Sequence, residues 1–212
     1  MIDLIATLAS KLKNGAVKLF EDFKGFINDV FKWLEELLGA KPARNITPEE
    51  LNWMASRKIG NLGGNILKET QIRKLRGFLK TKGIDLIVEG DAKSITRLFK
   101  PVDGFEKSDD LFYFMGRQKQ PYKGMFTAKT RQFFLTKDAT EIVAFHEQMH
   151  YFHFEEVGEL VYKQLNVLEK ETYVWKQILT NREKWTRAEL EDALNYINSK
   201  RKLFKLDPIN II

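Results

Sequence analysis

Residues 138–158 carry the sequence DATEIVAFHEQMHYFHFEEVG, which predicts a single amphipathic helix. The stretch opens with Asp138, a residue type that caps helices, and Glu141 follows at the third position, as in a capping box. An apolar stripe then recurs at helical spacing, formed by Ile142, Phe145, Met149 and Phe152. Gly158 marks the expected end of the helix.

This helix contains His146-Glu147-Gln148-Met149-His150, two histidines four positions apart with a glutamate directly after the first. Four residues make just over one helical turn, so both imidazoles leave the same face and can bind one tetrahedral Zn²⁺. Glu147 lies close enough to act as general base toward a water molecule activated by the zinc. The motif therefore predicts a zinc peptidase with His146 and His150 as ligands and Glu147 as the base.

A catalytic zinc site needs a third protein ligand, and the chain has no cysteine to supply one. The only further histidine, His153, lies seven residues after His146, about 10 Å along the helix axis, so one ion does not easily reach both. We expect His153 behind the ligands or at the rim of the site.

Two glutamates on the next predicted helix are better candidates for the third ligand. Glu171 falls on the apolar face that should pack inward, which it shares with Leu168, Trp175 and Ile178. Glu169 falls on a more polar side of the same helix. We therefore favour Glu171 as the third ligand and keep Glu169 as the alternative.

The remainder of the chain predicts an α+β domain around the motif helix. Short apolar runs separated by turn-rich stretches indicate a sheet of three or four strands, at residues 84–89, 111–115, 124–128 and 131–136. Helices are expected before the sheet at 47–58 and 66–82. Two more should follow the motif helix, one containing residues 165–179 and one running from Thr186, its cap, to about Lys200, with Glu189 as the partner of the cap. Residues 203–212 are expected to form an irregular tail.

Residues 1–40 are expected to form an amphipathic helical appendage, separate from a domain at 41–212. Residues 1–38 hold five lysines and six acidic residues, whereas membrane-binding helices usually carry an excess of Lys and Arg. We therefore expect this segment to pack on a partner or on the domain rather than on a membrane. The chain has no apolar run of about 18 residues that would span a bilayer, and its N-terminus lacks the pattern of a cleavable signal.

The charge of the chain is +6, with a pI near 9.3. The positive residues are scattered along the sequence and no aromatic RNA-binding motif accompanies them, so we expect a solvated lysine-rich surface and no nucleic-acid partner. The absence of cysteine excludes a disulfide scaffold and a thiolate metal site.

Residues 124–180 resemble the zincin superfamily, in the form whose third ligand is a glutamate. The resemblance rests on the strand at 131–135, the helix at 144–151, Gly158 and the segment 168–174. Within that superfamily the chain looks most like the metallopeptidase toxin domains of bacterial polymorphic toxin systems, because of the Glu-x-Tyr-Val flank, the short domain and the helical N-terminal appendage.

The resemblance implies zinc, cleavage of a protein target, a cognate immunity protein, and secretion or delivery of the chain as an effector that acts in a target cell. It also implies an edge strand at 131–136 that aligns the substrate by backbone pairing. It assigns no donor to the oxyanion of the reaction, for which Tyr162 and Tyr173 are candidates. Two other interpretations stay open: an intracellular regulatory or housekeeping zincin protease, and a non-catalytic helix-rich binding module.

Overall fold

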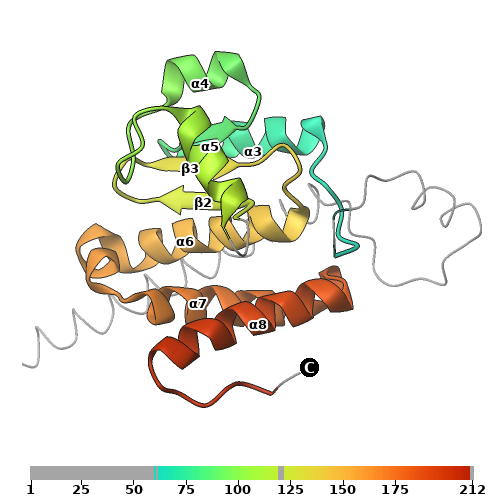
Figure 1. Ribbon diagram of the computed structural model, residues 1–212. Helices are drawn as coiled ribbons and strands as arrows, with labels where there is room; N and C mark the ends of the chain where they lie inside the picture. The colour runs from blue at the N-terminus through green and yellow to red at the C-terminus, as the bar shows by residue number, and fades with distance from the viewer. Residues whose placement is uncertain (1–59, 61, 119–121, 211–212) are drawn as a thin grey trace, which may run out of the picture. The chain divides into compact units, whose positions relative to one another are not determined.

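The computed structural model describes residues 60, 62–118 and 122–210, which form an α+β unit (Figure 1). Its elements in chain order are α3 (Glu69–Thr81), β1 (Asp85–Val88), α4 (Ala92–Leu98), α5 (Ser108–Arg117), β2 (Gly124–Thr127), β3 (Gln132–Leu135), α6 (Glu141–Gln164), α7 (Val167–Thr180), the 3₁₀ turn η1 (Arg182–Lys184) and α8 (Arg187–Leu203). The predicted α+β class is confirmed. The helices expected at 2–38 and 47–58, and the predicted domain boundary at 40/41, lie outside the described residues.

The three strands form one sheet in the order β1-β3-β2. β1 runs parallel to β3, and β2 runs antiparallel to it, joined by a tight hairpin. Arg131 closes this hairpin in the left-handed conformation, at φ 54°. The predicted strands at 84–89, 124–128 and 131–136 are thus confirmed.

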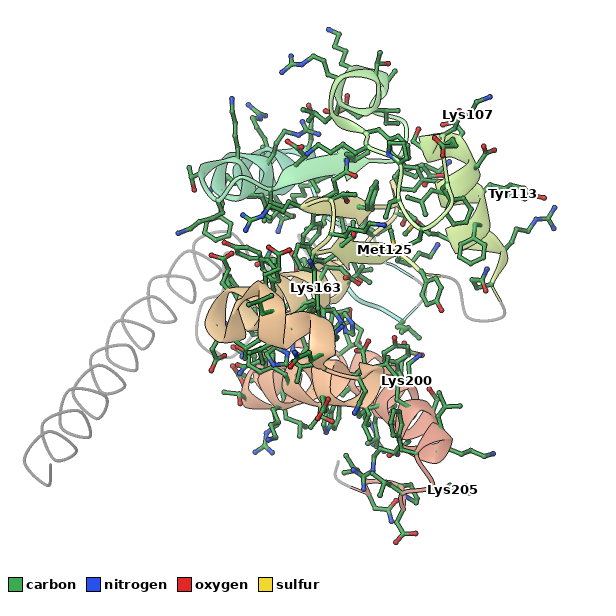
Figure 2. All side chains as sticks on the ribbon, turned by 90° about the vertical axis from the view of Figure 1, so that its left-hand side faces the viewer. Lys107, Tyr113, Met125, Lys163, Lys200 and Lys205 are labelled. Carbon is green, nitrogen blue, oxygen red and sulfur yellow. The ribbon has the colours of Figure 1, made fainter. Side chains whose placement is uncertain are left out.

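The strand expected at residues 111–115 is wrong, because these residues lie in helix α5. Leu111, Phe112 and Met115 are buried, whereas Tyr113 is 64% and Phe114 42% exposed, which is the three-and-four spacing of a helix and not the alternation of a strand. Figure 2 shows Tyr113 pointing away from the rest of the unit. Five consecutive apolar residues carry no periodicity, so the sequence pattern could not distinguish the two structures.

Both faces of the sheet are covered. One face, with Ile87 and Phe134, packs against α4, α5 and the loop between them. The other face turns toward α6, where the ring of Phe126 makes edge-to-face contacts with Tyr151 and Phe154. Beneath that layer α6, α7 and α8 lie side by side (Figure 1), and α7 contacts both of its neighbours. The sheet and α7 therefore hold α6 from two sides.

Helix α6 begins two residues later than the capping pattern predicts. Its N-cap is Thr140, not Asp138. The carboxylate of Asp138 instead accepts hydrogen bonds from Lys123, at 2.6 Å, and from Thr136, at 2.7 Å. Gly158 interrupts the helix at φ 79° and ψ 160°, as expected, although a further helical stretch continues to Gln164. The predicted Thr186–Glu189 capping box at the start of α8 is confirmed.

Candidate metal centre and active site

The imidazoles of His146 and His150 leave α6 on one face and converge on the carboxylate of Glu171 from α7. Their Nε2 atoms lie 3.1 Å apart. Glu171 Oε2 lies 3.3 Å from Nε2 of His146, and Oε1 lies 3.5 Å from Nε2 of His150. Atoms bound to one tetrahedral ion at bonds of 2.0–2.1 Å stand about 3.4 Å apart. These three side chains are therefore spaced as a group that could hold a metal ion.

The chemistry of the donors agrees with this spacing. Glu171 is only 7% exposed, so its carboxylate is buried next to the two imidazoles. Burial by itself raises the pKa of the Glu171 carboxyl, but hydrogen bonds and charge from His146 and His150 outweigh it, so the pKa is lowered. For His146 burial lowers the pKa, and Glu171 and Glu147 raise it by more. The buried carboxylate of Glu171 therefore lies beside two imidazoles. A metal cation that binds there can replace the protons that the imidazoles would otherwise carry.

Glu169, the alternative third ligand, lies elsewhere. It is exposed, and its Oε2 atom accepts the backbone N–H of Asn166 at 2.8 Å. Asn166 in turn caps the N–H of Glu169, which completes a capping box at the start of α7. Side chains two positions apart on a helix point in directions roughly 200° apart. Glu169 therefore stabilises the end of the helix, while Glu171 points toward His146 and His150.

Two tyrosines flank the three side chains. Tyr162, on the last turn of α6, lies with its hydroxyl 3.4 Å from Nδ1 of His150, on the side opposite Nε2. Tyr196, on α8, donates to Oε1 of Glu171 at 3.1 Å, and its ring meets His146 edge-to-face at 5.8 Å. Burial and the charge of Glu171 raise the pKa of Tyr196, so its hydroxyl stays protonated. No sequence pattern pointed to Tyr196, because it lies 46 residues after His150 on a separate helix.

Tyr173 and His153 lie behind the group. Their rings stack in parallel at 4.2 Å, and His153 also meets Tyr162 edge-to-face. His153 is buried, and its burial and the charge of His150 lower its pKa to about 4. It is not part of the group able to hold a metal, in line with the expectation from helix length. Tyr173, one of the two candidate oxyanion donors, is packed against His153.

Glu147 is held between α6 and the sheet. Its Oε2 atom accepts the backbone N–H of Phe126, on β2, at 2.8 Å. Gly124, also on β2, allows this close approach, because a Cβ atom there would lie 2.7 Å from Cγ of Glu147. Glu147 is 8% exposed, so α6 on one side and β2 on the other hold its side chain in place.

The edge strand expected at 131–136 is wrong. β3 occupies the centre of the sheet and pairs with both β1 and β2, so its backbone groups are already used. Among the described residues β2 is the edge that lies beside Glu147. The sequence could not reveal this, because strand order depends on pairings between distant segments.

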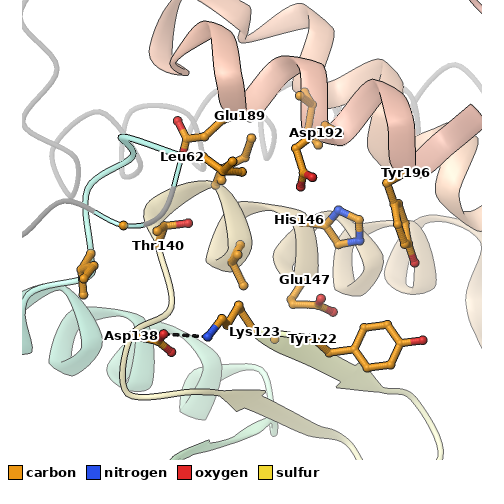
Figure 3. A pocket seen from close by; sticks show the side chains of 17 residues that line it. Leu62, Tyr122, Lys123, Asp138, Thr140, His146, Glu147, Glu189, Asp192 and Tyr196 are labelled. Carbon is orange, nitrogen blue, oxygen red and sulfur yellow. Dashed lines mark hydrogen bonds and ion pairs between the residues drawn. The ribbon is translucent and has the colours of Figure 1, made fainter. Parts of the chain in front are cut away.

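A pocket of about 510 Å³ opens next to these residues. His146, Glu147 and Tyr196 line one end, and the pocket continues between the start of α6 and the start of α8 (Figure 3). Lys123 lies along one wall of the pocket, where it pairs with Asp138, and Asp192 directs its carboxylate inward (Figure 3). Glu147 and one of the imidazoles therefore face a cavity large enough for a ligand to enter.

Comparison with protein families gives a match to the model described as metallopeptidase toxin 4, over residues 52–203. Searches among curated proteins and solved structures returned no match. Among the described helices, none has the length and apolar character needed to cross a bilayer. A metallopeptidase implies a metal, and His146, His150 and Glu171 form a group that could bind it. The chain belongs to the metallopeptidase toxin 4 family.

Proposed function

We propose that this chain is a zinc-dependent peptidase of the zincin type, in which His146, His150 and Glu171 hold the ion and Glu147 is the general base. The observation that carries the proposal is the convergence of the three side chains, at 3.1 to 3.5 Å, beside a pocket that Glu147 also lines. A set of two histidines and one glutamate, without sulfur ligands, is typical of catalytic zinc in peptidases. The bound zinc would supply Lewis-acid polarisation and would make water acidic enough to act near neutral pH.

Glu147 carries the proton in this mechanism. Its carboxylate takes a proton from the attacking water and delivers it to the nitrogen of the leaving amine. The hydrogen bond from the N–H of Phe126 engages Oε2 and fixes the side chain, so that Oε1 can face the reacting atoms. A fixed base reduces the reorganisation that the reaction requires.

Tyr196 is the best-placed donor for the oxygen of the scissile carbonyl as negative charge develops on it. Its hydroxyl is protonated, lines the pocket end and already lies 3.1 Å from Glu171. A donor aimed at that oxygen stabilises the transition state more than the ground state. Tyr162 is on the far side of His150 and would instead orient that imidazole.

The edge of β2 is the segment that we propose to align the substrate backbone, in the role first assigned to residues 131–136. In its antiparallel pair with β3, the register turns the backbone groups of Gly124 and Phe126 away from β3. The N–H of Phe126 is engaged by Glu147, which places the strand directly beside the base. An extended peptide that pairs here would bring a carbonyl close to Glu147.

We further propose that the chain is the toxin module of a bacterial polymorphic toxin system, delivered into a target cell, where it cleaves a protein, and neutralised by a cognate immunity protein. Membership of a metallopeptidase toxin family supports this role. An inhibitor that covers the pocket mouth would meet the acidic and aromatic side chains that line it, among them Asp192 and Tyr196.

The test uses the full chain with three variants. Elemental analysis should find one zinc per chain in the wild type and in Glu147→Gln, and none in His146→Ala. Glu147→Gln should lower cleavage of a peptide library by about 10³-fold and abolish growth arrest on expression inside bacteria. Glu159→Gln, an exposed glutamate of the same helix paired with Lys163, is the matched control and should match the wild type. Growth arrest that survives Glu147→Gln would refute the proposal.

A further inference from the structure

The pocket beside the base extends well past the metal-binding group. Most of its walls come from four places: Gly60, Leu62 and Ile66 before α3, the start of β2, the first turns of α6 and the first turns of α8. On α8 the lining residues are Glu189, Asp192, Ala193 and Tyr196. Asp192 stands one turn before Tyr196, about 6 Å along the axis. The cavity therefore runs from the reacting end to a carboxylate about one side-chain length away.

The charges in this pocket do not balance. Its one lysine, Lys123, is held by Asp138 at 2.6 Å, and Figure 3 shows the pair along one wall. Within the described residues neither Asp192, which is exposed, nor Glu189 takes part in an ion pair, whereas their neighbour Glu191 is paired with Arg187. Glu189 is 4% exposed and uses Oε2 to accept the N–H of Thr186. Two acidic side chains therefore face the cavity without a cation.

Much of the remaining lining of the pocket is apolar. It includes Leu62, Ile66, Ile142, Val143 and Ile178. Lys and Arg side chains have an aliphatic stem of three or four methylene groups and a cationic end, so they bury the stem on apolar surface and leave the charge at a polar rim. Both the apolar lining and the unpaired carboxylates match such a side chain.

We propose that this pocket is a specificity pocket for a lysine or arginine side chain of the substrate next to the scissile bond, with Asp192 as the residue that pairs with its charge. The inference rests on the proposed peptidase function. An acidic side chain would meet the carboxylates of Asp192 and Glu189, and an uncharged one would leave both unpaired. Lys200 is engaged elsewhere, because its amine lies 4.4 Å from the ring centroid of Tyr196, and it stands two turns along α8 from Asp192.

The decisive measurement is the ratio of cleavage rates for two otherwise identical peptides. One carries lysine and the other norleucine, which has the same stem without the charge, at the position selected from a peptide library. Wild type should prefer lysine. Asp192→Asn should lower the lysine-to-norleucine ratio about fivefold, as expected for one partly solvated ion pair. Asp192→Lys should move the preference to glutamate. Glu191→Gln, on another side of α8, is the matched control and should keep the wild-type ratio.

Two results overturn the inference while the peptidase function stands: cleavage without preference for a basic residue, or a preference that Asp192→Asn leaves unchanged. If no peptide is cleaved, binding decides. Calorimetry on the zinc-loaded chain should then show lysine hydroxamate binding more tightly than norleucine hydroxamate, with the difference lost in Asp192→Asn. Equal affinities, or no binding of either compound, refute the specificity pocket.

Discussion

Glu171 on α7 and Glu189 on α8 are buried almost equally, at 7% and 4% exposure, but their surroundings act in opposite directions. Around Glu171, two imidazoles and the hydroxyl of Tyr196 face the carboxylate, and its pKa is lowered. Around Glu189, burial raises the pKa, the N–H of Thr186 offsets this only in part, and the charge of Glu141 adds to the rise. Burial alone therefore does not distinguish these two carboxylates, whereas the donors around each of them do.

The largest difference should appear in metal binding when each carboxylate is removed. Glu171→Gln should weaken zinc binding at least about 100-fold, since loss of a ligand exceeds the 10- to 100-fold effect of its outer partners. Glu189→Gln should leave the affinity unchanged. The measurement is competition with a coloured chelator. Glu169→Gln is a second control, because the amide keeps the capping acceptor. Equal losses in Glu171→Gln and Glu169→Gln would contradict the assignment.

The next largest effect should appear in the pH dependence of zinc binding, which concerns the surroundings of Glu171 and not those of Glu189. The pKa of His146 is raised above its usual 6.5 in the metal-free chain. An imidazolium cannot bind zinc, so the affinity should be constant at high pH and should fall by about tenfold per pH unit as the pH drops through that raised pKa. Calorimetry from pH 8.5 to pH 6 tests this. A zinc affinity that stays constant across this range would show that zinc binding releases no proton from His146, which would contradict the prediction.

A smaller effect on zinc binding is expected from removal of the Tyr196 hydroxyl, which donates to Glu171. Tyr196→Phe keeps the ring against His146 and removes only the donor to Glu171. Zinc binding should weaken about tenfold. kcat should fall as well, with KM little changed, because the same hydroxyl serves the transition state. Tyr162→Phe, which alters only the contact to His150, should affect zinc binding without this selective loss of kcat.

The smallest effect concerns the stability that Glu189 contributes. Its folded-state pKa is raised above the usual 4.5, so the buried charge opposes folding at neutral pH. As the pH falls through that raised pKa the folded chain takes up the proton first and becomes more stable. Glu189→Gln should therefore add up to about 1 kcal/mol of unfolding free energy at pH 7. The gain should shrink as the pH falls and vanish below about pH 4, where the carboxyl is protonated in both the folded and the unfolded chain. Urea unfolding at pH 7 and at about pH 3.5 measures it, and a gain that persists at the lower pH would exclude this origin.

The prediction from sequence succeeded where periodicity was strong. The three confirmed strands, the capping box of α8 and the interruption at Gly158 each follow from local patterns. It failed where the pattern was uniform, as in the apolar run that forms α5, and where a side chain had a distant competitor, as Asp138 has in Lys123. The prediction that residues 131–136 form an edge strand failed for a similar reason. Pairing between β1 and β3 joins segments that are separated by two helices and a strand.

The sequence by itself determined that the two histidines share one helix face, that the glutamate between them lies close by, and which face of α7 turns inward. All of these depend on the fixed 100° step of a helix. Only the tertiary structure decided that Glu171 lies within 3.5 Å of both imidazoles, that Tyr196 donates to it, that β2 fixes Glu147, and that Asp192 faces an apolar pocket. The residues in the first three relations lie 21 to 25 positions apart, and the pocket joins residues as distant as Leu62 and Asp192. No local rule of spacing reaches so far, because packing, and not helical phase, brings them together.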